Sequence, residues 1–148
     1  LQPWHANIKK RQVKAPKVYI RDTGLLHLLL GLKTTTEILR HPRCGASWEG
    51  YVIEEVVRSV APEDIYFWST HNGAEVDLIF LAKGKMYGIE CKRKDAPVLT
   101  PSMRTALKDL KLARIAVIYP GEKRYSLHSQ VEAVPFEEIA RGMKGIFK

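Results

Sequence analysis

The sequence predicts an α/β domain in which a mixed β-sheet is flanked by helices. Three short runs rich in apolar, branched and aromatic residues have the length of strands, at residues 65–69, 78–81 and 115–119. Two longer segments, residues 47–60 and a segment that opens at Thr100, have the composition and start signals of helices. The order helix, strand, hairpin, helix, strand is typical of such a sheet, and 148 residues suit one domain.

The first elements follow a basic N-terminal segment. Residues 18–20 are expected to form a short strand or an apolar anchor. Asp22 is a suitable N-cap for a helix that ends at Gly31. Because this helix is apolar on nearly all sides, we expect it to be buried.

The helix at residues 47–60 carries the first candidate site residue. Glu49 follows the same helical face as Ile53, Val56 and Val60. We therefore expect Glu49 to face the sheet, whereas Glu54 lies nearer the solvent side. The alternative is that Glu49 stands in the first turn only because a negative charge there interacts favourably with the positive end of the helix dipole.

The central feature is a predicted hairpin at residues 73–94 that turns at Lys83-Gly84, where glycine tolerates a positive φ. With a two-residue loop, Asp77 lies opposite Glu90, and residues opposite each other share a face of the sheet. Lys92 is two residues further along and points to the same side. Asp77, Glu90 and Lys92 are therefore expected to converge.

Two carboxylates and an amine in this arrangement fit a metal site. Carboxylates are hard oxygen ligands of the kind that Mg²⁺ or Mn²⁺ prefers. A bound ion there can polarise a phosphoryl oxygen and activate water, and Lys92 can orient that water or offset phosphate charge. The alternative is a salt bridge between Lys92 and its acidic neighbours.

The later elements follow from their caps and composition. Thr100 and Pro101 are typical of the start of a helix. Residues 115–119 form a buried strand, and residues 125–127 and 131–134 form short ones. A terminal helix is expected over residues 135–139.

The net charge of +8 is concentrated at one end of the chain. Residues 1–21 contain six basic side chains and no acidic one, whereas the remainder is nearly balanced. Such a segment can bind the phosphates of DNA. The alternatives are a solvated connector and a docking surface for another domain.

Several classes of protein are disfavoured. There is no long apolar run for a membrane span and no signal-peptide core, so we expect a cytoplasmic protein. Cys44 and Cys91 do not form a metal-binding pattern. Without a phosphate-binding Gly-Lys-Ser/Thr loop, this chain alone should not hydrolyse ATP. Because the sequence does not begin with Met, we expect a fragment or a processed product.

The order of Glu49, Asp77 and Glu90-Cys91-Lys92 resembles the PD-(D/E)XK nuclease superfamily, in which an acid on a helix joins an Asp and a Glu-x-Lys from a hairpin. More closely, nearly the whole chain resembles the C-terminal domain of unknown function of prokaryotic AAA-type ATPases. Ser69 stands where that family often has Arg. The matching stretches are residues 14–25, 45–49, 66–68, 73–77 and 89–92.

The resemblance implies a restriction-endonuclease-like core over residues 18–148. Residues 1–17 would end an upstream winged-helix region, which an ATPase domain precedes. It also implies Mg²⁺ or Mn²⁺ held by Asp77, Glu90 and Glu49, with Lys92 acting on the attacking water. The implied function is metal-dependent hydrolysis or binding of DNA. The alternative is a non-catalytic module that docks the ATPase to a partner.

Overall fold

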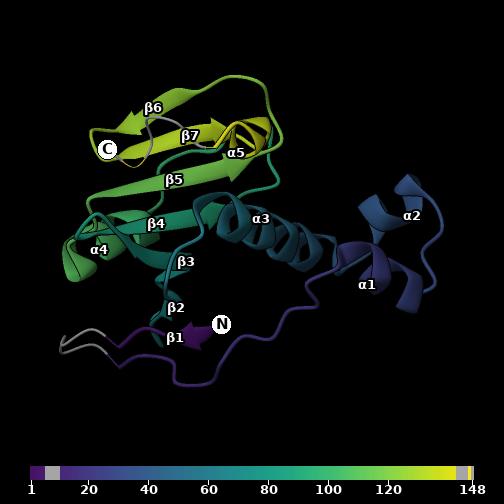
Figure 1. Ribbon diagram of the computed structural model, residues 1–148, viewed down its shortest axis with the longest axis horizontal. Coiled ribbons are helices and arrows are strands. Elements are labelled where there is room, and N and C mark those ends of the chain that lie inside the picture. Colours follow the sequence, from purple (N-terminus) through teal and green to yellow (C-terminus); the bar gives the residue numbers. More distant parts are fainter. Residues whose placement is uncertain (6–10, 143–146, 148) are drawn as a thin grey trace.

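A computed structural model describes residues 1–5, 11–142 and 147. Figure 1 shows a twisted sheet with helices on both faces, as the sequence predicts. The seven strands lie in the order β1-β2-β3-β4-β5-β7-β6. The strands are β1 (Gln2–Pro3), β2 (Ile65–Ser69), β3 (Glu75–Ala82), β4 (Lys85–Cys91), β5 (Arg114–Tyr119), β6 (Tyr125–His128) and β7 (Val131–Pro135). The helices are α1 (Thr23–Leu29), α2 (Thr35–Arg40), α3 (Cys44–Val60), α4 (Pro101–Leu110) and α5 (Glu137–Ala140).

The β3–β4 hairpin turns at the predicted place. Ala82 pairs with Lys85, and Lys83 and Gly84 between them have φ values of 51° and 72°. A two-residue hairpin loop needs positive φ at its central residues, which explains why glycine stands at the second one. The predicted register is therefore confirmed from Ala82 to Leu78, which pairs with Ile89.

Strands β4, β5 and β7 run parallel, because α4 carries the chain back between β4 and β5, whereas the edge strand β6 pairs antiparallel with β7. Thr100 caps α4 by accepting a hydrogen bond from the Met103 N–H, and Pro101 occupies the first turn, as the sequence predicts. Strand β5 then pairs in parallel with β4 and β7. The predicted terminal helix is present as the short α5, which begins two residues later than expected.

Two apolar clusters hold the layers together. On one face, Val52, Ile53 and Val56 of α3 pack with Leu78 and Phe80 of β3. On the other, buried residues of α4 pack with Val76 and Ile79 of the same strand, among others. The sheet is thus covered by α3 and α5 on one face and by α4 on the other.

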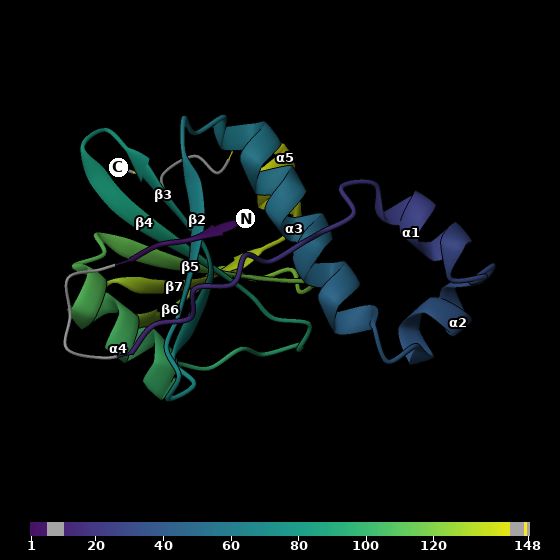
Figure 2. The same cartoon turned by 90° about the horizontal axis from the view of Figure 1, so that it is seen from below.

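The prediction that the first helix is buried is wrong. Asp22 caps α1 as expected, but none of its residues is buried, and the side chains of Leu28 and Leu29 are 72% and 69% exposed. Figures 1 and 2 show why: α1 and α2 project beyond one end of α3, away from the sheet. No described segment covers their outer side. Among the described residues, no helix has both the length and the apolar character needed to cross a bilayer.

The N-terminal segment returns along β2. Strand β1 pairs in parallel with β2. It is β1 that forms the edge of the sheet, and the sequence did not indicate this strand. Residues 18–20 form no strand; Val18 is 90% exposed, and only Tyr19 of the three packs inward, against Gly50 of α3. The expected apolar anchor is therefore reduced to a single aromatic ring.

Candidate metal centre

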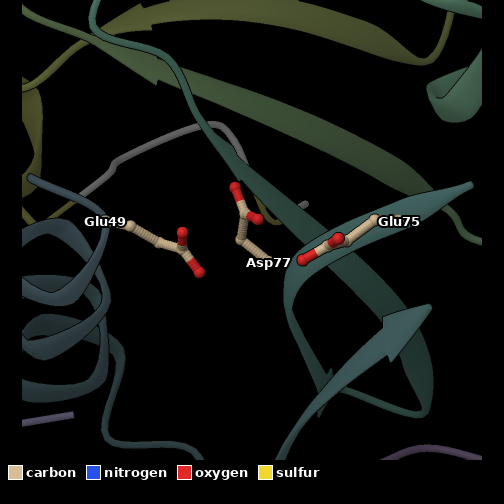
Figure 3. Close-up of side chains that lie close together, drawn as sticks. All are labelled: Glu49, Glu75 and Asp77. Atoms are coloured by element: carbon tan, nitrogen blue, oxygen red, sulfur yellow. The ribbon is translucent and has the colours of Figure 1, made fainter. Parts of the chain in front are cut away.

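Helix α3 presents Glu49 toward the hairpin. The Glu49 carboxylate lies close to that of Asp77 (Figure 3) and accepts a hydrogen bond from the Tyr19 hydroxyl. Glu54, the other acid considered from the sequence, instead binds the Arg21 guanidinium, with the Glu54 Oε2 to Arg21 Nε distance at 2.9 Å. The helix therefore directs these two acids to different places, and the structure brings Glu49 to the hairpin.

Asp77 sits at an irregularity in β3 that counting along a regular strand could not anticipate. The register against β2 shifts between Tyr66, opposite Ile79, and Trp68, opposite Val76. As a result Val76 and Leu78 face opposite sides of the sheet although they are two residues apart. Such β-bulges redirect side chains and are common beside active sites.

The Asp77 carboxylate takes the place of a backbone partner in the hydrogen bonding between β3 and β4. The paired register ends at Leu78 and Ile89, and just beyond it the Cys91 N–H donates to Asp77 Oδ2 at 2.7 Å. This bond fixes the Asp77 side chain and leaves its second oxygen on the side of Glu49. The two strands therefore part where the acids gather.

A third carboxylate, that of Glu75, lies beside those of Glu49 and Asp77. The sequence did not clearly indicate it. Glu49, Glu75 and Asp77 each offer an oxygen within 4.8 Å of the others, and Figure 3 shows all three side chains converging from α3 and β3. We call these residues the acidic cluster. Glu75 lies two residues before Asp77, within the family-matching stretch at residues 73–77, and these were its signals in the sequence.

Glu90 and Lys92 form a pair next to the acidic cluster rather than part of it. The Glu90 Oε1 and Lys92 Nζ atoms are 2.6 Å apart. The Glu90 side chain is only 8% exposed, and its Oε2 atom is buried with no hydrogen-bond partner among the described residues. A buried carboxylate oxygen without a partner is rare in proteins and calls for an ion or water.

The electrostatics reflect crowding of buried acids. Burial, together with the nearby charges of Glu90 and Glu49, raises the pKa of Asp77 to about 8. Burial also raises the pKa of Glu90, although Lys92 opposes the shift. Burial lowers the pKa of Lys92, but the charge and hydrogen bond of Glu90 outweigh it, so that amine stays protonated. Like charges forced together in this way favour a bound cation.

The ammonium group of Lys17 already contacts the acidic cluster. Lys17 Nζ lies 3.1 Å from Glu49 Oε1 and 3.9 Å from Asp77 Oδ1, and it also contacts Glu75 Oε1. In the sequence this lysine belongs to the basic segment and to one of the stretches that match the family, residues 14–25, but neither signal gives it a place beside the acids. No local pattern links it to Glu75, which is 58 residues away.

The comparisons with known proteins agree with the expected family at the coarser level. Residues 44–139 match the profile of the domain of unknown function DUF4143, and residues 1–36 match that of the domain of unknown function DUF8612. The DUF4143 match covers most of the chain, which therefore belongs to that family.

Two curated relatives are 51% identical over 139 residues, or 94% of this chain: uncharacterized protein Mb2031c of Mycobacterium bovis and uncharacterized protein Rv2008c of Mycobacterium tuberculosis. The matched region is 32% of each relative, so the chain spans about a third of their length. No solved structure matches significantly.

Proposed function

We propose that this DUF4143 domain is a nuclease-like domain that binds a divalent metal ion and acts on the phosphodiester backbone of DNA. The observation that carries the proposal is the gathering of three carboxylates, from Glu49, Glu75 and Asp77, at the point where β3 and β4 part, with the Glu90–Lys92 pair beside them. The Glu90 Oε2 atom, which has no hydrogen-bond partner among the described residues, gives separate support, since a buried carboxylate oxygen left without a partner carries a cost of about 1–3 kcal/mol.

The donor set fits Mg²⁺ or Mn²⁺, because all of its atoms are carboxylate oxygens. Asp77 and Glu49 would hold the ion, with Glu75 and Glu90 within the same group of charges. A metal ion bound there would polarise a phosphoryl oxygen and lower the pKa of a bound water. Membership of the PD-(D/E)XK superfamily is part of the same proposal.

Lys92 has the position expected of a residue that acts on water or on the phosphate. Its amine is half-buried, stays protonated and is held by Glu90 at 2.6 Å. In this role Lys92 orients the attacking water and offsets negative charge that develops on the phosphate. It is not a metal ligand, so its loss should affect cleavage rather than metal binding.

DNA is the proposed partner because of the net charge and its placement. The chain carries +8, and exposed basic side chains such as Arg11 and Lys14 lie on the N-terminal segment. Lys9 and Lys10, which belong to the same basic run, lie outside the described residues. Neutralising phosphates with such residues gives binding that weakens with salt.

The resemblance to the C-terminal domains of AAA-type ATPases supports a wider setting. We propose that an ATPase domain and a winged-helix region accompany this domain in the full-length protein. The large unmatched part of the two mycobacterial relatives is compatible with that arrangement.

A second candidate function is a non-catalytic docking module. The observation that favours it is Lys17, because an ammonium group among three carboxylates can neutralise the acidic cluster without a metal. The exposed leucines of α1 offer an apolar surface for a partner. On this interpretation the acids stabilise the fold and no chemistry takes place.

A cleavage assay separates the two functions. Supercoiled, linear double-stranded and single-stranded DNA are incubated with the chain and Mg²⁺ or Mn²⁺, beside EDTA controls and Lys92→Ala. The nuclease proposal predicts cleavage that EDTA abolishes and that Lys92→Ala lowers by about 10²–10³. Absence of cleavage of any DNA form, together with a destabilised Lys92→Ala, would favour the docking module.

A further inference from the structure

An extended segment lies across the acidic cluster and is fixed on both sides of it. We call residues 11–21 the strap; it follows β2 and then passes α3 on its way to α1 (Figures 1 and 2). Before the cluster, the Val13 N–H donates to the Ser69 carbonyl at 2.9 Å. After it, the Tyr19 hydroxyl donates to Glu49 and its ring packs against Gly50. Lys17 stands between these two anchors.

The Lys17 amine occupies the place that a cation would take. It contacts one oxygen from each member of the acidic cluster, at 3.1 Å from Glu49, 3.9 Å from Asp77 and in close contact with Glu75. Burial lowers the pKa of Lys17, but its hydrogen bonds to Glu75 and Glu49 and their charges raise it above the ordinary value, so the amine remains charged.

We propose that Lys17 and a divalent metal ion compete for the acidic cluster, so that the strap is a built-in antagonist of metal binding. The inference rests on the proposed metal-binding function. Two cations cannot share three carboxylate oxygens that lie within 4.8 Å of one another without strong repulsion. Metal loading therefore requires the Lys17 amine to leave, and the metal-free state is the one in which Lys17 is seated.

The two lysines near the site thus have different roles. Lys92 pairs with Glu90 beside the cluster and can stay when a metal ion binds. Lys17 is paired with the candidate ligands themselves, so it must move. A change in the strap that withdraws Lys17 would raise metal affinity, which couples the site to whatever the N-terminal segment contacts.

The first test measures Mn²⁺ binding without DNA by calorimetry. Lys17→Met keeps the length and apolar stem of the side chain and removes its charge. It should bind Mn²⁺ at least about tenfold more tightly than the wild-type chain, a difference of about 1.4 kcal/mol. The matched control is Lys14→Met, which changes an exposed lysine of the same strap and should leave the affinity unchanged. Asp77→Asn should lose binding.

The second test uses the wild-type chain, so it does not depend on how the variant folds. Lysines are acetylated with and without Mn²⁺, and the modified residues are quantified by mass spectrometry. Lys17 should be protected in EDTA and become several-fold more reactive with Mn²⁺, whereas Lys14 should react equally in both.

The outcomes separate the inference from the function it rests on. If Asp77→Asn loses Mn²⁺ while Lys17→Met binds no more tightly than wild type and Lys17 stays protected, the competition is refuted and the metal site stands. If neither wild type nor Lys17→Met binds Mn²⁺, the metal site itself is refuted, and the inference with it.

Discussion

Replacing Asp77 with asparagine should stabilise the metal-free domain at alkaline pH. The Asp77 oxygen lies within 4.8 Å of oxygens of Glu49 and Glu75. At an effective dielectric constant of about 20, each such pair of charges repels by about 3.5 kcal/mol. The Lys17 Nζ atom lies 3.9 Å from Asp77 Oδ1 and offsets this repulsion with about 4 kcal/mol of attraction. The balance is a net repulsion of about 3 kcal/mol, before the charge of Glu90 is added.

The amide in the Asp77→Asn variant would keep the shape of the side chain. It can still accept the hydrogen bond from the Cys91 N–H, although a neutral acceptor is weaker by about 1 kcal/mol. We therefore expect the free energy of unfolding to rise by about 2 kcal/mol at pH 8.5 in EDTA. For a domain of this size that corresponds to about 4–8 °C in Tm.

The pH dependence gives the sign of the effect. The folded-state pKa of Asp77, about 8, lies above that of an ordinary unfolded Asp near 3.9. The folded state therefore binds more protons between these values, and the wild-type chain loses stability as the pH rises through this window. Asp77→Asn lacks that loss, so its advantage should grow from pH 4 to pH 8 and vanish at the acid end.

Thermal unfolding from pH 4 to pH 9 in EDTA measures this directly. Asp64→Asn, which changes an exposed acid before β2, is the matched control and should have little effect at any pH. An Asp77→Asn variant that is less stable than wild type at pH 8.5 would refute the reasoning. It would mean that the ion pair with Lys17, rather than repulsion among the acids, dominates at Asp77.

Three further outcomes are expected. Glu49→Gln should weaken Mn²⁺ binding at least about tenfold, whereas Glu54→Gln on the same helix should not; equal effects would remove Glu49 from the site. Gly88→Ala should destabilise the domain by about 1–3 kcal/mol in urea unfolding, because its Cβ would lie 3.1–3.3 Å from three apolar side chains; a neutral change would show that this core can yield. Neutralising Arg11 and Lys14 together should lower the slope of log affinity for DNA against log salt by about 2, and an unchanged slope would assign the strap to docking.

Local signals explain what could be predicted from the sequence. The Lys83-Gly84 turn and the Thr100 cap depend on neighbours in the chain, and both are where they were expected. The α/β class follows from the order of such elements. The helix face that carries Glu49 could also be inferred, because helical periodicity depends on the same few residues.

Long-range contacts explain what was missed. The bulge at Asp77 arises from the pairing of β3 with β2, and no residue within β3 signals it. Lys17 reaches Glu49 and Glu75 only because the chain returns along β2. The burial of α1 was predicted from its leucines, but its composition does not reveal that the helix stands beyond the end of the sheet.

The most direct test of the metal site is anomalous diffraction from crystals of the chain soaked in Mn²⁺. A metal site at the acidic cluster predicts one strong peak in contact with Asp77 and Glu49, with the Lys17 amine displaced from its present position 3.1 Å from Glu49 Oε1. A map without a manganese peak at these carboxylates, and with Lys17 still bound to Glu49 and Glu75, would contradict it.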